Sequence, residues 1–166
     1  MYRTAAITAL AVAFAVAGVT ASPALAEERT CRGTIGATTV DNLRVPQGAT
    51  CTLNGTKVKG TVKVERGATL KASRIRVVGN VQGDGAAVVN VADSRVGGSI
   101  QVVQGGKSKV VGNVVKHDVQ YFENRGKIAI RSNRINGNLQ CKENSPGPNG
   151  GGNVVQGTKE DQCSRL

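Results

Sequence analysis

Short apolar–polar–apolar triplets recur along this chain at an almost constant spacing. The first residues of successive triplets are separated by 19, 19, 19, 19 and 20 residues. The six triplets are Leu43-Arg44-Val45, Val62-Lys63-Val64, Val81-Gln82-Gly83, Ile100-Gln101-Val102, Val119-Gln120-Tyr121 and Leu139-Gln140-Cys141. Alternation with a period of two predicts strands, and a fixed long period indicates a repeat architecture.

Further columns of similar residues keep the same spacing. One apolar column contains Val58, Val77, Val96, Val115 and Ile135. Another contains Leu53, Ala72, Val91, Val110 and Ile130, preceded two residues earlier by Cys51, Leu70, Val89, Ser108 and Ile128. Each repeat therefore predicts three short strands separated by glycine or small polar residues. The corner column is Gly60, Gly79, Gly98, His117 and Gly137. We expect its glycines to permit sharp turns, often with positive φ.

The constant register predicts an all-β fold, a single-stranded parallel β-helix (a β-solenoid). Each coil would lie on the previous one at a spacing of about 4.8 Å, and the inward columns would fill a narrow core. About six coils, over residues 38–157, would make a rod roughly 30 Å long. The alternation and the glycine content exclude a helical repeat.

The first 26 residues have the features of an export signal. Arg3 precedes an apolar run, and Ala24-Leu25-Ala26 is a small-residue cleavage pattern. Cleavage after Ala26 would leave residues 27–166 as one domain. Its net charge would be +11 − 1 = +10, because Arg3 is the one charged residue removed. This segment predicts a secreted, extracellular protein with no membrane span.

Four cysteines remain after such cleavage, which indicates disulfide bonds in an exported chain. Four cysteines allow three pairings. Cys31 and Cys51 are 20 residues apart and Cys141 and Cys163 are 22 apart, each close to one coil. This spacing favours Cys31–Cys51 and Cys141–Cys163, which would staple the two end coils. The Pro- and Gly-rich residues 145–152 predict a loop, placed at 142–152, before a C-terminal cap at 158–166.

The repeat between about residues 43 and 141 resembles that of small exported bacterial parallel β-helix proteins. It is more distantly similar to the repeat of bactofilins, cytoskeletal β-helices that polymerise end to end. The resemblance implies a β-helix and carries no catalytic residue to this chain.

The net charge of +11 indicates attraction to anionic partners. The repeat spacing places Lys57, Arg76, Arg95 and Arg134 in one column, broken by Val114. The nearby cations are Lys59, Lys71, Arg74, Lys109, Lys116 and Arg131. We take the four cations of the column together with Lys71 and Arg74 as the candidate ligand-binding residues. Aromatic residues make up 2% of the chain and Trp is absent, so any nucleic-acid binding should be non-specific.

Three other patterns suggest chemistry. Gln82, Gln101, Gln120 and Gln140 follow Arg44 and Lys63 in one outward column, and their amides could hydrogen-bond along the stack. Glu65 and Asp84 are 19 residues apart and could form an acid/base pair or share a cation. His117, the single histidine, precedes Asp118 in a corner. Of Tyr121 and Phe122, one should face outward.

The leading hypothesis is a secreted, non-enzymatic β-helix scaffold that binds an anionic cell-envelope or extracellular polymer, such as an acidic polysaccharide, through its basic columns. One alternative is a polysaccharide lyase or hydrolase using Glu65 and Asp84, with His117 a weaker catalytic candidate. Another is a structural surface protein that self-assembles through the rod ends. We expect no cofactor and no metal site, and the sequence leaves the ligand, the oligomeric state and the handedness of the coil open.

Overall fold

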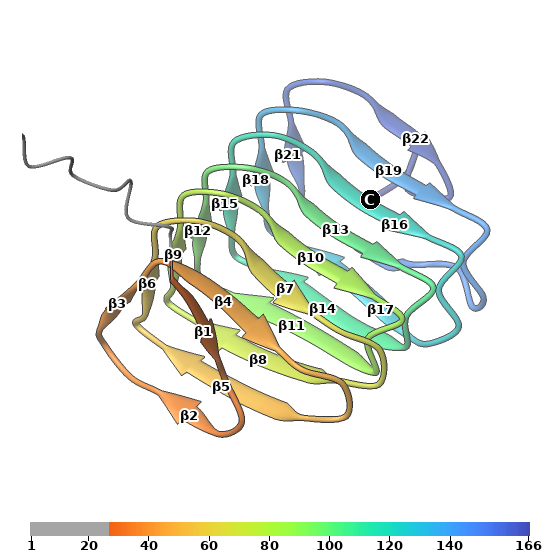
Figure 1. Cartoon of the computed structure of the whole chain (residues 1–166). Coiled ribbons are helices and arrows are strands. Elements are labelled where there is room, and N and C mark those ends of the chain that lie inside the picture. The colour runs from red at the N-terminus through yellow and green to blue at the C-terminus, as the bar shows by residue number, and fades with distance from the viewer. Residues whose placement is uncertain (1–26) are drawn as a thin grey trace, which may run out of the picture.

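The computed structural model describes residues 27–166, and the export signal expected at 1–26 lies outside these residues. The described chain is an all-β parallel solenoid with 22 strands in three sheets (Figure 1). Successive coils stack so that each strand pairs in parallel with the equivalent strand of the neighbouring coil. The predicted fold class is therefore confirmed.

The three sheets form the three long sides of the rod. Sheet A contains β1 (Glu28–Thr30), β4 (Asn42–Val45), β7 (Val62–Val64), β10 (Val81–Asp84), β13 (Ile100–Val103), β16 (Val119–Phe122), β19 (Leu139–Lys142) and β22 (Lys159–Asp161). Sheet B contains β2 (Thr34–Ile35), β5 (Thr50–Asn54), β8 (Thr69–Ser73), β11 (Val88–Ala92), β14 (Lys107–Val111), β17 (Ile128–Arg131) and β20 (Asn149–Gly151). Sheet C contains β3 (Thr39–Val40), β6 (Lys57–Val58), β9 (Arg76–Val77), β12 (Arg95–Val96), β15 (Val114–Val115), β18 (Arg134–Ile135) and β21 (Val154–Val155).

The sequence columns coincide with the structural register. Val62 pairs with Val81 and Val81 with Ile100, and all three side chains are buried. The solenoid has about seven turns rather than six, because β1 to β3 form a coil before the first recognised repeat. The sequence pattern did not reveal this coil, because Arg29 stands opposite Leu43, at a position where the other coils have an apolar residue. Eight strands in sheet A give a rod of about 34 Å at the usual strand spacing.

The corner glycines between sheets C and A have a role different from the one expected. Gly79 and Gly98 do not have positive φ. A Cβ at Gly79 would instead lie 2.7 Å from the carbonyl oxygen of Gly60 on the preceding coil. Glycine is needed at this corner because neighbouring backbones approach closely there.

Positive φ occurs at the corner between sheets A and B, as at Gly67 and Gln104, and at the corner between sheets B and C. The residues that follow the sheet B strands there have φ between 50° and 69°: Gly55, Arg74, Asp93, Gly112, Ser132 and Gly152. Non-glycine residues tolerate this left-handed conformation at a cost. The turn is therefore fixed by the coil geometry, and the repeat accepts several residue types in it.

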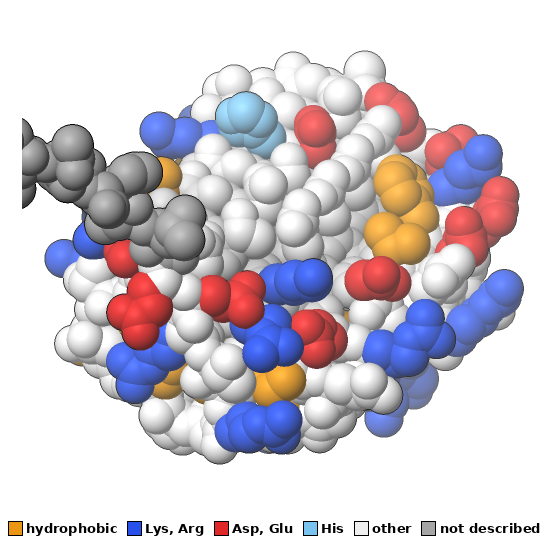
Figure 2. All heavy atoms as spheres, in the orientation of Figure 1, with side chains coloured by type: hydrophobic (Ala, Val, Ile, Leu, Met, Phe, Trp, Pro, Cys, Tyr) orange, Lys and Arg blue, Asp and Glu red, His pale blue; other side chains and the backbone are white. Residues whose placement is uncertain are grey.

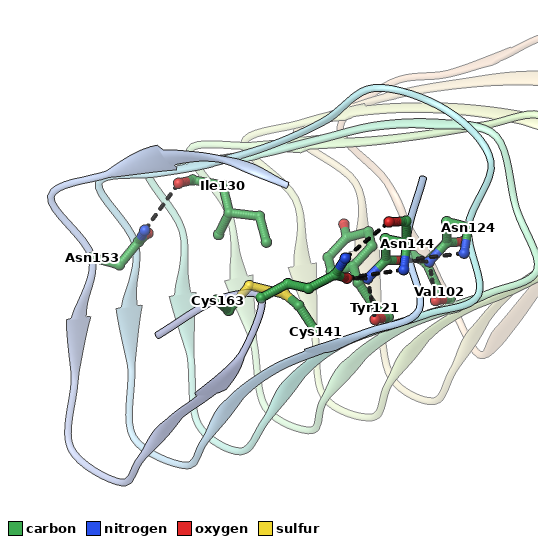
Figure 3. The surroundings of a disulfide bond; sticks show 9 residues. Val102, Tyr121, Asn124, Ile130, Cys141, Asn144, Asn153 and Cys163 are labelled. Atoms are coloured by element: carbon green, nitrogen blue, oxygen red, sulfur yellow. Dashed lines mark hydrogen bonds between the residues drawn. A yellow bond between two sulfur atoms is a disulfide. The ribbon is translucent and has the colours of Figure 1, made fainter. Parts of the chain in front are cut away.

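Polar side chains occupy the inside of the corners and hydrogen-bond to neighbouring coils. The Asn133 Nδ2 donates to the Val110 carbonyl oxygen at 2.8 Å, and its Oδ1 accepts the Asn113 backbone N–H at 3.0 Å. Asn124 and Asn144 repeat this arrangement at the corner between sheets A and B (Figure 3). Buried polar groups need such partners, so these ladders fix the stacking of coils.

The cysteines pair as the spacing predicts. Cys31 bonds to Cys51 and Cys141 to Cys163, with Cα–Cα distances of 5.6 and 5.3 Å. After β22 the chain turns inward, and Cys163 and Leu166 are buried at the end of the core (Figure 3). Both bonds are compatible with an extracellular or otherwise oxidising environment.

The loop expected at 142–152 is only partly a loop. Asn149–Gly151 form β20, which pairs with β17. Gly150 lies opposite Ile130, where a Cβ would overlap the Ile130 carbonyl oxygen. The glycines that predicted a loop therefore permit a closely packed terminal strand.

Candidate functional site

Charged residues are divided unequally among the three sheets. The four acidic residues that lie in strands, Glu28, Asp84, Glu160 and Asp161, are all in sheet A. Five cations share that sheet, which gives its strands a net charge of 5 − 4 = +1. The strands of sheets B and C each contain four cations and no acid. The net positive charge of the chain is thus concentrated on two of its three sides.

Sheet C carries the predicted basic column. Lys57 pairs with Arg76 and Arg76 with Arg95, while Val114 separates Arg95 from Arg134. All four cations are exposed. Within residues 27–166 the salt bridges of cations involve Arg44, Lys59 and Lys142, so this column has none. Adjacent cations about 4.8 Å apart repel one another unless an anion or salt screens them.

Beside this column lies a shallow hollow of about 420 Å³. Val78 and Val114 contribute apolar surface, and the Val78 side chain is 64% exposed. Arg76, Arg95 and Lys116 also line the hollow. Gly97 also lines the hollow, and a Cβ there would overlap the Val78 carbonyl oxygen, so the close approach of the two coils requires glycine. We call the sheet C basic face the surface made of this hollow and five cations: Lys57, Arg76, Arg95, Lys116 and Arg134.

Two of the six predicted binding residues lie elsewhere. Lys71 is on sheet B, and Arg74 is at the corner between sheets B and C. The Arg74 Nη2 donates to Asn54 Oδ1 at 2.8 Å. The structure thus places Lys57, Arg76, Arg95 and Arg134 together on one sheet and separates Lys71 and Arg74 from them.

Sheet A carries the amide ladder expected from the sequence. Gln82 donates to Gln101 at 3.1 Å, Gln101 to Gln120 at 2.6 Å and Gln120 to Gln140 at 2.7 Å. The Gln140 Nε2 ends the series by donating to Glu160 Oε2 at 2.7 Å. Figure 2 shows this side, where acidic and basic side chains are interspersed around a largely uncharged stretch. The ladder satisfies its own hydrogen bonds and stabilises the coil stack.

Glu65 and Asp84 line one hollow of about 760 Å³, as their spacing predicts. The Glu65 carboxylate already has two partners, the Gln47 backbone N–H at 3.0 Å and Arg44 Nη1 at 3.3 Å. The Gln47 hydrogen bond has the largest effect on the Glu65 pKa and lowers it; partial burial opposes this, and Arg44 lowers the pKa further. An ionised, ion-paired carboxylate is poorly suited to act as a general acid.

The remaining candidates are His117, its neighbour Asp118, and the aromatic pair Tyr121 and Phe122. His117 is exposed in the corner between sheets C and A, and its backbone N–H donates to Gly98. The Asp118 carboxylate accepts the Asn138 N–H at 2.7 Å. Tyr121 is buried against Ser108, whereas Phe122 is partly exposed, which confirms that one of the two faces outward.

Sequence reasoning placed Lys109 near the basic column and missed that it belongs to a second group of cations, on sheet B. Lys107 and Lys109 alternate outward along β14, and Lys127 directly precedes β17. All three line a hollow of about 370 Å³ together with Asn90 and Ala129. Lys107 and Lys127 are 20 residues apart, so the repeat spacing could have revealed their stacking. We call these three residues the sheet B lysine cluster.

Comparisons with protein-family models, curated proteins and solved structures gave no significant match. Among residues 27–166, no helix is long and apolar enough to cross a membrane. The same residues contain no group of three or more His, Cys, Asp or Glu side chains arranged to hold a metal ion.

Proposed function

We propose that this protein is a secreted, non-enzymatic β-helix scaffold that binds an anionic polymer of the cell envelope or extracellular space. The observation that carries the proposal is the sheet C basic face. Lys57, Arg76, Arg95 and Arg134 lie in register along the rod. These four cations and Lys116 are exposed and form no salt bridge among the described residues. The +10 charge expected for the exported chain and the export signal support the same conclusion.

An acidic polysaccharide fits this face better than a purely phosphate-based polymer. A sugar acid presents an apolar C–H surface and a carboxylate. In the hollow, Val78 and Val114 can contact the C–H surface of the sugar. The cations that can bind its carboxylate are Arg76, Arg95 and Lys116. Guanidinium groups bind carboxylates through paired hydrogen bonds, which adds orientation to charge attraction.

Two alternatives remain as weaker proposals. The shared hollow favours an enzyme that uses Glu65 and Asp84, but the ion pair of Glu65 with Arg44 supports a structural role for that carboxylate. Self-assembly through the rod ends is opposed by the burial of Cys163 and Leu166 at the C-terminal end. The likeness to small exported β-helix proteins belongs with the leading proposal.

The test compares two triple variants with the same change in net charge. One changes the sheet C basic face, Arg76→Gln, Arg95→Gln and Arg134→Gln. The other changes exposed cations of sheet A, Lys63→Gln, Lys142→Gln and Lys159→Gln. Binding of each purified protein to polygalacturonate and to polyphosphate is measured at low salt.

We expect the sheet C variant to bind polygalacturonate about tenfold more weakly than the unmodified protein, since each exposed ion pair contributes up to about 1 kcal/mol. The sheet A variant should bind nearly as well as the unmodified protein. Equal weakening in both variants would show that only net charge matters. If the unmodified protein bound neither polygalacturonate nor polyphosphate, the proposal would be refuted. Tighter binding to polyphosphate would assign the face to phosphate polymers.

A further inference from the structure

The sheet B lysine cluster is a second basic surface that differs in shape from the sheet C basic face. Lys107 and Lys127 stack on adjacent coils, and Lys109 lies two residues along β14. The three cations therefore form a compact triangle over two coils. The strands of sheet B contain no acidic residue, and within residues 27–166 these lysines form no salt bridge.

The two surfaces lie on different sides of the rod (Figure 1). On the coils that carry the cluster, the corner between sheets B and C consists of the uncharged pairs Gly112-Asn113 and Ser132-Asn133. Lys109, the member of the cluster nearest to that corner, precedes it by three residues, which is about 10 Å of extended chain. The corner residues are uncharged, and the exposed Arg131 at the end of β17, which donates to Asn149 Oδ1 at 3.1 Å, lies between Lys127 and Arg134. The cluster and the column are thus held apart by their positions on two different sheets.

The direction of the basic column also keeps the two surfaces apart. The column on sheet C runs along the rod axis, because its members occupy equivalent positions on successive coils. A stiff polyanion aligned with it would follow sheet C and would not turn over the corner onto sheet B.

We infer that the protein binds two anionic polysaccharide chains at once, one on the sheet C basic face and one on the sheet B lysine cluster, and so cross-links them. This inference rests on the proposed function. It adds that a single monomer is bivalent, with an extended site and a compact site. The rigid coil stack holds the two sites at a fixed angle, which makes the protein a bridge between polymer strands.

Two measurements test the bivalence with galacturonate polymers as the probe. Calorimetry with a short oligogalacturonate counts the chains bound per protein. Fluorescence energy transfer between donor-labelled and acceptor-labelled polygalacturonate, mixed in excess over protein, reports cross-linking. The proteins are the unmodified protein, the sheet C triple variant, the sheet A triple variant and a sheet B variant with Lys107→Gln, Lys109→Gln and Lys127→Gln.

The unmodified protein and the sheet A variant should bind two oligomers and produce energy transfer. The sheet B and sheet C variants should each bind one oligomer and lose the energy transfer. One oligomer bound by the unmodified protein would overturn the bivalence while leaving the proposed function intact, as would energy transfer that survives in the sheet B variant. Absence of any binding would instead refute the proposed function together with this inference.

Discussion

At the scale of single residues, buried polar side chains are held by groups on neighbouring coils. Asn133 is 1% exposed and forms backbone and side-chain hydrogen bonds to the coil before it and the coil after it. Its polar atoms replace water for the Asn113 N–H and the Val110 carbonyl. Such a residue contributes to stability mainly because its loss leaves buried partners unsatisfied.

We expect Asn133→Ala to lower the free energy of unfolding by about 2–4 kcal/mol, because two buried backbone groups lose their partner. Asn136→Ala is the matched control. Asn136 is exposed three residues further on, and its truncation should change stability by less than about 0.5 kcal/mol. Denaturant unfolding measures both variants. Similar stabilities for the two would show that the corner ladder does not stabilise the coil stack.

Tyr121 predicts a loss of stability at alkaline pH. Its side chain is fully buried, and burial raises its pKa far above the ordinary value, while its hydrogen bond with Ser108 lowers it slightly. The folded state favours the neutral phenol. The contribution of the buried phenol to the free energy of unfolding is therefore fully present below pH 10 and is lost as the pH rises through and beyond 10. Tyr121 is the only tyrosine of residues 27–166.

The absorbance of tyrosinate therefore reports on this one side chain. In the chain beginning at Glu27 it should appear together with unfolding, seen by circular dichroism, and well above pH 10. Tyr121→Phe should unfold at a higher pH than the unmodified chain. Tyrosinate absorbance near pH 10 in a fully folded protein would contradict the burial of this phenol.

At the scale of strands and corners, close backbone approach decides where glycine is required. Gly79→Ala should destabilise the fold by about 1–3 kcal/mol, because the added Cβ would lie 2.7 Å from the Gly60 carbonyl oxygen and 2.8 Å from Thr61 Oγ1. Gly36→Ala is the control, since nothing lies within 4 Å of a Cβ there. Thermal unfolding distinguishes them, and an equal effect on both would rule out steric contact as the reason for glycine.

The disulfide at the C-terminal end should stabilise its own coil most. In a Cys141→Ala, Cys163→Ala variant the chain-entropy model predicts a loss of about 3 kcal/mol. A solenoid is stabilised by contacts between neighbouring coils, so local opening should be greatest at the end. Hydrogen exchange should accelerate in β22 and remain slow in β10 and β13. Equal acceleration of hydrogen exchange in β22, β10 and β13 would show instead that the solenoid unfolds as one cooperative unit.

Much of the fold can be predicted from sequence because the repeat is visible in apolar side chains. Val62, Val81 and Ile100 reveal both the period and the core. The first coil was missed because Arg29 stands at the end of the stack, where a core residue is not required. Strand β20 was missed because Gly150 and Gly151 predict a loop, whereas close packing on Ile130 requires glycine.

At the scale of the whole molecule, the repeat determines which charges share a side. The spacing alone placed Lys57, Arg76, Arg95 and Arg134 in a column. The same columns place Lys71, between Leu70 and Ala72, on a different predicted strand from Arg76, but only the backbone shows that the two strands face different sides of the rod. The hollow beside Val78 could not be predicted from the spacing either, because residues of three stacked coils line it.

The salt dependence of polygalacturonate binding tests the central claim most directly. The slope of log affinity against log salt concentration counts the cations that an anionic chain contacts. The triple variant of Arg76, Arg95 and Arg134 should reduce the magnitude of this slope by about three relative to the unmodified protein, because each cation contributes about one. The sheet A triple variant should keep the original slope. Equal slopes for all three proteins, or binding that does not depend on salt, would contradict a polyanion site on sheet C.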